Sequence, residues 1–98
     1  MPRRVILTAR AVADVSAAIR YLHIEAGPRT VETFEHEVDR TLSLLQTFPG
    51  AAPVYRGEYR RLSLSRFRYT LYYRADTDSL VIVALEHQCR DPRRLRLG

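Results

Sequence analysis

The stretch RFRYTLYYR, residues 66–74, decides the fold, because its side chains alternate in character with the two-residue period of a β-strand. The odd positions are apolar or aromatic and should fill a core: Phe67, Tyr69, Leu71 and Tyr73. The even positions are mostly polar or cationic: Arg66, Arg68, Thr70, Tyr72 and Arg74. The pattern predicts a strand with one buried face. It leaves two interpretations of the arginine face, a contact surface for a partner or an ordinary solvated face.

Two more strands flank this stretch. Residues 59–65 alternate between leucine and mainly polar side chains, and a tight turn near Ser65 and Arg66 joins them to residues 66–74. After the turn ADTDS, residues 75–79, the segment 80–87 is apolar on both faces, which is typical of a strand in the interior of a sheet. We expect these three strands to form a meander.

The first helix is predicted over residues 9–26, after a short strand at residues 4–8. Thr8 is suited to cap this helix, and Gly27 and Pro28 are suited to separate it from the next one. Its apolar face has the spacing of a helix and consists of Val12, Val15, Ile19 and Leu22. A second stripe of small residues permits close approach of another element: Ala11, Ala18 and Ala26.

The second helix is predicted over residues 29–47. Its apolar face consists of Val31, Phe34, Val38, Leu42 and Leu45, and its acidic residues are expected mostly elsewhere: Glu32, Glu35, Glu37 and Asp39. Because the turn between the helices is short, they should be antiparallel neighbours. The whole order predicts an α+β fold, β-α-α-β-β-β, with a helical hairpin packed on one face of a mainly antiparallel sheet.

The length of 98 residues fits one domain over residues 1–98, in which residues 90–98 form a basic C-terminal tail. The longest apolar run, residues 80–85, is much shorter than the roughly 20 residues that span a bilayer, so we expect no membrane helix. The N-terminus lacks the pattern of a secretory signal, and the single cysteine, Cys89, cannot form an internal disulfide. These features favour the cytoplasm.

The charge of the chain is unevenly distributed. All 16 basic residues are arginine. Residues 1–55 hold six arginines and six acids, whereas residues 56–98 hold ten arginines and five acids, so the net charge of +5 belongs to the second half. A basic C-terminal half favours an acidic or phosphate-bearing partner, and a solvated arginine-rich surface is the simpler alternative.

Motifs for cofactors and metals are missing from the sequence. The glycines do not form a phosphate-binding loop, which argues against a nucleotide cofactor. The histidines, His23, His36 and His87, are spread over three predicted elements without the spacing of metal ligands. We therefore expect neither a cofactor nor a metal.

The segment EHQCRDP, residues 86–92, contains the one histidine with a candidate chemical role. His87 lies two residues after Leu85 and should share a face with Val81, Val83 and Leu85 at the rim of the sheet. There the imidazole could act as an acid or a base. The structural alternative is a histidine that only holds the end of the strand.

Two residues near His87, Arg90 and Cys89, differ in the chemical roles that the sequence suggests for them. Arg90 could pair with Glu86 or Asp91, or could bind phosphate with two hydrogen bonds. Cys89 has no local motif that would activate its thiol, so we interpret it as a residue without a catalytic role.

Taken together in their order, these features resemble the ParE/RelE superfamily of small toxins from bacterial type II toxin-antitoxin modules. The resemblance covers most of the chain and rests on AVADVSAAIRYL in the first helix, Phe34 in the second, and then FPG, RRLSLSRFRYTLYYR and the HQCRDP ending. It implies a toxin that is neutralised by an antitoxin encoded beside it. The largely disordered C-terminal segment of such an antitoxin folds as it wraps the toxin.

The tyrosine-rich strand and the H-x-x-R-D ending are similar to the ParE-like branch. That similarity implies a role in plasmid stabilisation, a ParD-like antitoxin, and poisoning of DNA gyrase by binding. Binding requires a surface and no catalytic set. The candidates for contact with the target or the antitoxin are Arg60, Arg61, Arg66, Arg68, Arg74, Arg90, Arg93, Arg94 and Arg96.

The RelE-like branch implies a different activity, the ribosome-dependent cleavage of mRNA. This reaction needs groups that activate a 2′-hydroxyl and stabilise a charged phosphorane. The chain has no lysine and has Thr70 where that branch commonly has arginine, and arginine is a poor base because its pKa exceeds about 12. The catalytic set of this alternative is His87, Arg90 and Arg61. A non-toxic relative that acts as a protein-binding module is the third interpretation.

Overall fold

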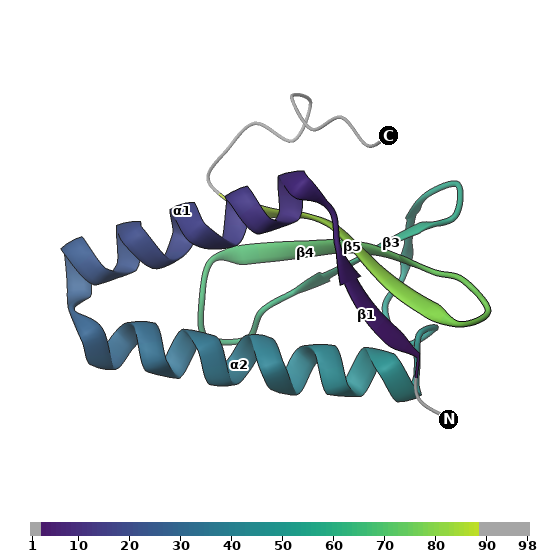
Figure 1. Cartoon of the computed structure of the whole chain (residues 1–98), viewed down its shortest axis with the longest axis horizontal. Helices are drawn as coiled ribbons and strands as arrows, with labels where there is room; N and C mark the ends of the chain where they lie inside the picture. The colour runs from purple at the N-terminus through teal and green to yellow at the C-terminus, as the bar shows by residue number, and fades with distance from the viewer. Residues whose placement is uncertain (1–2, 89–98) are drawn as a thin grey trace.

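The computed structural model of the protein describes residues 3–88, which form two helices packed against a five-stranded sheet (Figure 1). The strands are β1 (Arg4–Leu7), β2 (Val54–Arg56), β3 (Tyr59–Ser63), β4 (Tyr69–Ala75) and β5 (Ser79–His87). The helices are α1 (Ala9–Ala26) and α2 (Pro28–Thr47). The predicted α+β fold with a helical hairpin on one face of the sheet is confirmed, with one strand more than predicted.

The helices begin and end close to their predicted positions, because the capping residues act as the sequence suggests. The Thr8 hydroxyl accepts a hydrogen bond from the Ala11 N–H at 3.1 Å and caps α1. Gly27 separates the helices with a φ of +88°, a value that glycine adopts readily, and Pro28 is the first residue of α2. Figure 1 shows the two helices side by side as an antiparallel pair.

The strand order in the sheet is β1-β5-β4-β3-β2. β1 pairs with β5 in parallel, and the other neighbours pair antiparallel. The prediction that residues 80–87 form an interior strand is confirmed, since β5 lies between β1 and β4. The unpredicted strand, β2, has three residues at the edge of the sheet, too few to show an alternation in the sequence.

The core lies between the helices and the sheet. Phe34 of α2 is 1% exposed, and its ring packs edge-on against Phe67 at 5.2 Å and Tyr69 at 5.7 Å between ring centroids. On α1 the small residues Ala11 and Ala18 are buried, so the helix lies close to β5. The prediction for Val12 is wrong: its side chain is 52% exposed.

The odd residues of the stretch 66–74 occupy the core as predicted, and the even residues do not form the predicted face. The strand begins at Tyr69, so Arg66 and Arg68 lie in the connection between β3 and β4. Thr70 and Tyr72 point away from the helices but are buried, at 9% and 5% exposure. Tyr72 is covered because Tyr55 of β2 packs edge-on against it, with the ring centroids 5.2 Å apart.

A β-bulge in β5 changes which residues face the helices. Val83 is an extra residue, because the residues on either side of it pair with consecutive residues of β4. As a result Ile82, before the bulge, and Leu85, after it, both pack in the core under the helices. His87 lies on the same side as Leu85 and Ile82, and the prediction that it shares a face with Val81 and Val83 is wrong.

Candidate functional site

Among the described residues, the arginines predicted to form one contact surface are divided between the two faces of the sheet and the connection between β3 and β4. Arg60 and Arg61 are consecutive in β3, so their side chains point to opposite faces. Arg60 pairs with Tyr73 and lies on the side of the helices, where its guanidinium donates a hydrogen bond to the Ala52 carbonyl at 2.6 Å. Arg60 is therefore held by a structural contact.

Arg61 lies on the far face, which we define as the face of the sheet opposite the helices. Its guanidinium is 4.7 Å from the centroid of the Tyr55 ring, and that of Arg56 is 5.7 Å from the same centroid. The Tyr55 ring packs in turn on Tyr72. We call Tyr55, Arg56, Arg61 and Tyr72 the far-face cluster. Arg56 was not predicted, because the short strand that carries it has no periodic signal.

Arg74 also belongs to the far face, but its charge is largely compensated. Its guanidinium lies 3.5 Å from a carboxylate oxygen of Glu58 and 3.5 Å from one of Asp76. Within residues 3–88, the other ion pairs all involve Arg10. The two arginines of the far-face cluster and the exposed arginines of the β3–β4 connection thus have no carboxylate partner in the described part of the chain.

The connection between β3 and β4 is anchored to α2 by a buried carboxylate. Glu37 is 4% exposed and accepts hydrogen bonds from the Ser65 hydroxyl at 3.0 Å and from the Arg66 N–H at 3.2 Å. These bonds hold the exposed side chains of Arg66 and Arg68 at one end of the sheet. The prediction that the acids of α2 lie mostly off the apolar face missed Glu37, because its partners are distant in the sequence.

His87 lies at a pocket between α1 and the paired ends of β4 and β5. The pocket has a volume of about 250 Å³ and is lined by Asp14, Ala17, Ala18, Tyr21, Tyr69, Leu85, Glu86 and His87. The imidazole packs edge-on against Tyr69 at 5.1 Å and Tyr21 at 6.4 Å between ring centroids. We call this the α1–β5 pocket. The helix residues that line it had no signal in the sequence beyond their helical spacing.

The structure does not bring together the residues of the alternative catalytic set. His87 pairs with Tyr69 of β4, whereas Arg61 pairs with Tyr72 of the same strand. Because these two positions of β4 point to opposite faces, His87 and Arg61 lie on opposite sides of the sheet. Arg90, the third member, lies outside the described residues, as do the tail candidates Arg93, Arg94 and Arg96.

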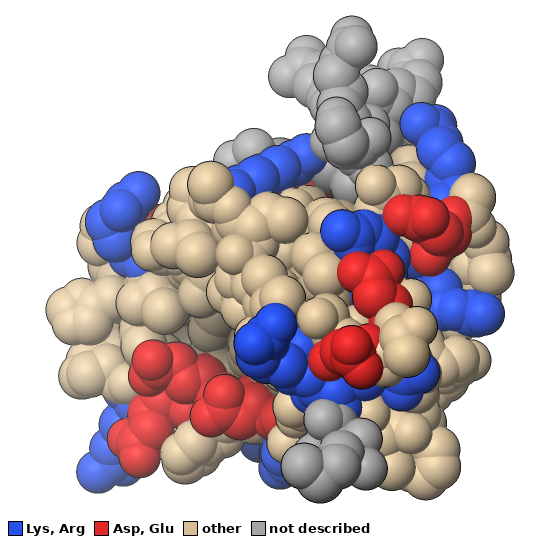
Figure 2. Space-filling model, turned by 45° about the vertical axis from the view of Figure 1, so that its right-hand side comes forward, with Lys and Arg blue, Asp and Glu red and all other residues tan. Residues whose placement is uncertain are grey.

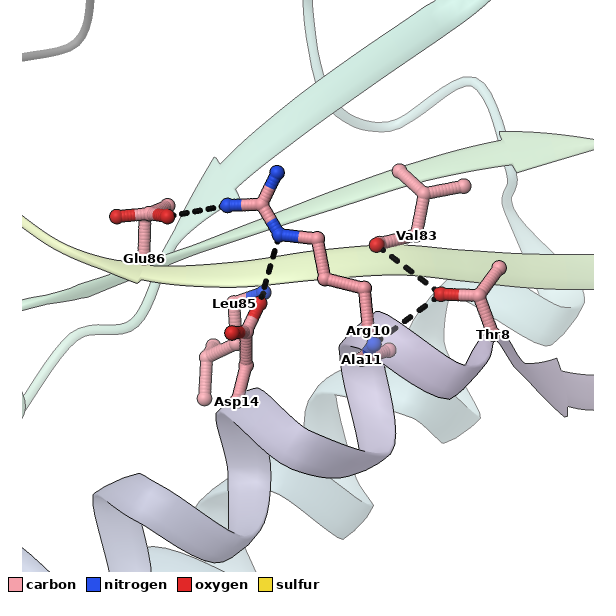
Figure 3. A network of polar contacts seen from close by, with 7 residues as sticks. All are labelled: Thr8, Arg10, Ala11, Asp14, Val83, Leu85 and Glu86. Atoms are coloured by element: carbon pink, nitrogen blue, oxygen red, sulfur yellow. Dashed lines mark hydrogen bonds and ion pairs between the residues drawn. The ribbon is translucent and has the colours of Figure 1, made fainter. Parts of the chain in front are cut away.

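Beside the pocket, side chains from the start of α1 pair with the backbone of β5 (Figure 3). β1 pairs with β5 only as far as residue 82, so the backbone groups that follow need other partners. The Thr8 hydroxyl donates to the Val83 carbonyl at 3.1 Å, and the Asp14 carboxylate accepts from the Leu85 N–H at 3.0 Å. The first turns of α1 thus cover an edge that would otherwise lack hydrogen bonds.

Arg10 completes this network by bridging two carboxylates. Its Nε lies 3.4 Å from Asp14 Oδ2, and its other end donates to Glu86 Oε1. One guanidinium therefore stands between two carboxylates at the rim of the α1–β5 pocket. Glu86, which the sequence offered as a partner for Arg90, is thus paired with Arg10, and Arg90 itself lies outside the described residues.

Charges of both signs are mixed over the surface. Figure 2 shows basic and acidic side chains close together on the side that faces the viewer, next to a broad uncharged area. Within residues 3–88, no group of three or more His, Cys, Asp or Glu side chains is arranged to hold a metal ion. The helices of this part of the chain are too short or too polar to cross a membrane.

Comparison with known proteins places this fold and sequence in context. Residues 5–92 match the model of the family described as the ParE toxin of type II toxin-antitoxin systems, parDE. A solved structure of a chromosomal ParDE toxin-antitoxin system from P. aeruginosa is similar, with a TM-score of 0.74, 20% identity, and coverage of 87% of this chain and 95% of that chain.

A second similar structure is an archaeal RelE–RelB complex from Pyrococcus horikoshii. It has a TM-score of 0.59 and 15% identity, and the match covers 93% of this chain and 100% of that chain. At these identities the two structures show the shared fold. Comparison with curated proteins finds no significant match.

Proposed function

Because the chain belongs to the ParE toxin family of type II toxin-antitoxin systems, we propose that it inhibits DNA gyrase by binding and is neutralised by a cognate ParD-like antitoxin. The observation that carries the binding mechanism is the separation of His87 from Arg61 by the sheet. His87 was the only base available to the predicted catalytic set. With the two groups on opposite faces, the arginines serve a contact surface better than an acid-base mechanism.

The far-face cluster suits an acidic or phosphate-bearing target. The guanidinium groups of Arg56 and Arg61 lie near the Tyr55 ring, which orients them without neutralising their charge. A planar guanidinium that keeps its charge and its hydrogen-bond donors can bind carboxylates or phosphates with two bonds. Arg66 and Arg68 are further exposed cations, in the connection between β3 and β4.

The direct test is the supercoiling of relaxed plasmid by purified gyrase, titrated with this protein and then with its antitoxin. We expect inhibition of supercoiling and accumulation of cleaved DNA, both relieved by the antitoxin. Unaffected supercoiling by a folded protein that still stops growth would overturn gyrase as the target.

Two adjacent arginines provide a matched pair of variants for the contact surface. Arg61→Ala should weaken gyrase inhibition at least roughly tenfold, because charged contacts are lost, and should leave the melting temperature unchanged. Arg60→Ala should retain inhibition per folded molecule and lose about 1 kcal/mol of stability with its hydrogen bond to Ala52. If both variants inhibit equally, the far-face cluster is not the contact surface.

Ribosome-dependent mRNA cleavage is the second candidate, and the α1–β5 pocket is the observation that favours it. His87 and Glu86 both line this pocket, so an imidazole and a carboxylate border the same cavity. His87→Ala separates the two functions in a growth assay. Loss of toxicity with a retained fold would favour cleavage, whereas full toxicity would argue against it.

A further inference from the structure

The α1–β5 pocket is lined by acidic side chains, whereas the far-face cluster is cationic. Two of its lining residues, Asp14 and Glu86, are carboxylates, and a third, Tyr21, offers an aromatic ring that belongs to a side chain 52% exposed. Carboxylates next to an aromatic ring are the surroundings that a guanidinium group prefers, since it donates hydrogen bonds in its plane and stacks through its face.

The carboxylates of the pocket retain capacity for a second cation. Arg10 supplies one positive charge between two negative ones. Within residues 3–88, Arg10 and the Leu85 N–H bond to one oxygen of each carboxylate, Asp14 Oδ2 and Glu86 Oε1. Asp14 Oδ1 and Glu86 Oε2 accept no hydrogen bond from residues 3–88, and these side chains are 23% and 20% exposed. Each of the two carboxylates therefore has one oxygen available to a further N–H donor.

The exposed side of α1 provides an approach to the pocket. Up to the middle of the helix, its exposed residues are uncharged: Ala9, Val12, Ala13, Ser16 and Ala17. Ala17 and Tyr21 belong both to this exposed side and to the pocket. Small side chains permit a partner backbone to come close, so a segment that lies along α1 can place one long side chain in the pocket.

The negative charge of the two pocket carboxylates indicates which kind of partner the pocket can bind. A target of the far-face arginines is acidic or carries phosphate, and such a target would be repelled by Asp14 and Glu86. The pocket therefore suits a different partner, with a basic residue, on the side of the helices. In a toxin-antitoxin pair that partner is the antitoxin.

We propose that the α1–β5 pocket receives an arginine side chain from the antitoxin segment that wraps this toxin. The guanidinium donates to Asp14 Oδ1 and Glu86 Oε2 and stacks on the ring of Tyr21. The proposal rests on the antitoxin partnership of the proposed function and is independent of the identity of the target.

The first test uses a small probe and the full chain. Nα-acetyl-arginine methylamide is titrated into the isotope-labelled protein, and amide resonances are followed by NMR, with acetyl-norleucine methylamide as a neutral control. We expect shifts at Tyr21 and at residues 85–87 with the arginine amide only. Equal shifts with both amides, or no shifts at these residues, would overturn the proposal.

The second test uses the antitoxin and three toxin variants. Glu86→Gln removes a charge but keeps an acceptor for Arg10, and Tyr21→Leu removes the ring from an exposed position. Both should weaken antitoxin binding roughly tenfold or more, whereas Glu25→Gln, an exposed acid of the same helix, should leave it unchanged. Unchanged antitoxin affinity in both pocket variants, with normal melting temperatures, would overturn the proposal.

Two controls distinguish this proposal from the gyrase proposal and from binding of the chain's own C-terminal tail. Without antitoxin, the pocket variants should inhibit gyrase as strongly as the parent does. If the parent itself does not inhibit gyrase, gyrase is not the target. The antitoxin affinities of the variants would still show whether the pocket binds the antitoxin. If the arginine amide binds only after Arg90, Arg93, Arg94 and Arg96 are changed to glutamine, the chain's own tail occupies the pocket and the antitoxin does not.

Discussion

Tyr73 shows how one buried residue links two parts of the chain. Its side chain is 0% exposed in β4, and its hydroxyl donates to the Pro49 carbonyl at 2.7 Å, which ties the loop after α2 to the sheet. Burial raises the pKa of the Tyr73 hydroxyl above the ordinary value of 10.0, although a backbone hydrogen bond from Ala52 and the charge of Arg60 act in the opposite direction. The neutral phenol is therefore part of the folded state.

Tyr73→Phe should lower the free energy of unfolding by about 1–3 kcal/mol at neutral pH, because the Pro49 carbonyl loses its donor. Between neutral and alkaline pH, the variant should also lose less of its free energy of unfolding than the parent does. In the parent, the unfolded phenol ionises near pH 10 while the folded one keeps its proton, so stability is full below about pH 10 and falls as the pH rises through the raised pKa. Urea unfolding at about pH 8 and about pH 11 measures both effects.

The exposed Tyr21 provides the control for this experiment, since Tyr21→Phe should leave the free energy of unfolding at about pH 8 unchanged. An identical alkaline decrease in the parent and in Tyr73→Phe would show that another group causes it.

At the scale of the elements, a single carboxylate joins α2 to the connection between β3 and β4. Glu37→Ala should lower the free energy of unfolding by about 2–3 kcal/mol, because the Ser65 hydroxyl and the Arg66 N–H lose a charged acceptor. Glu35→Ala, an exposed change on the same helix, should stay within about 0.5 kcal/mol of the parent. Urea unfolding measures the difference, and equal stability of the two variants would contradict the anchoring role of Glu37.

At the scale of the whole molecule, the sheet is complete only when the first strand of the chain pairs with the last one, because residues 4–7 of β1 pair with residues 79–82 of β5. The interior strands β4 and β5 contain most of the buried side chains of the sheet, whereas β2 is a three-residue edge strand. We expect amide hydrogens of β4 and β5 to exchange only through global unfolding and those of β2 to exchange through smaller openings. Native-state hydrogen exchange in increasing urea tests this, and equal protection of β2 and β4 would disprove it.

Much of the fold could be predicted from the sequence because the relevant signals are local. The ends of α1, the turn at Gly27 and Pro28, and the buried odd residues of β4 follow from capping and from side-chain period, which act over a few residues. The family resemblance was confirmed by the match over residues 5–92. The candidate site was harder to predict from the sequence. Its arginines and His87 were identified as candidates, and their roles stay predictions. The sequence did not indicate that Arg56 or the α1 residues of the pocket belong to a site.

The sequence by itself determined the two helices, the main strands and the family of this protein, because period, caps and motifs are properties of neighbouring residues. Only the tertiary structure decided which side chains share a surface. The bulge at Val83 sets the side on which His87 lies, the pairing of β3 with β4 sends Arg60 and Arg61 to opposite faces, and Glu37 is buried by partners far along the chain. Each of these outcomes depends on the register between segments that are distant in the sequence, and the period of a single segment does not specify that register.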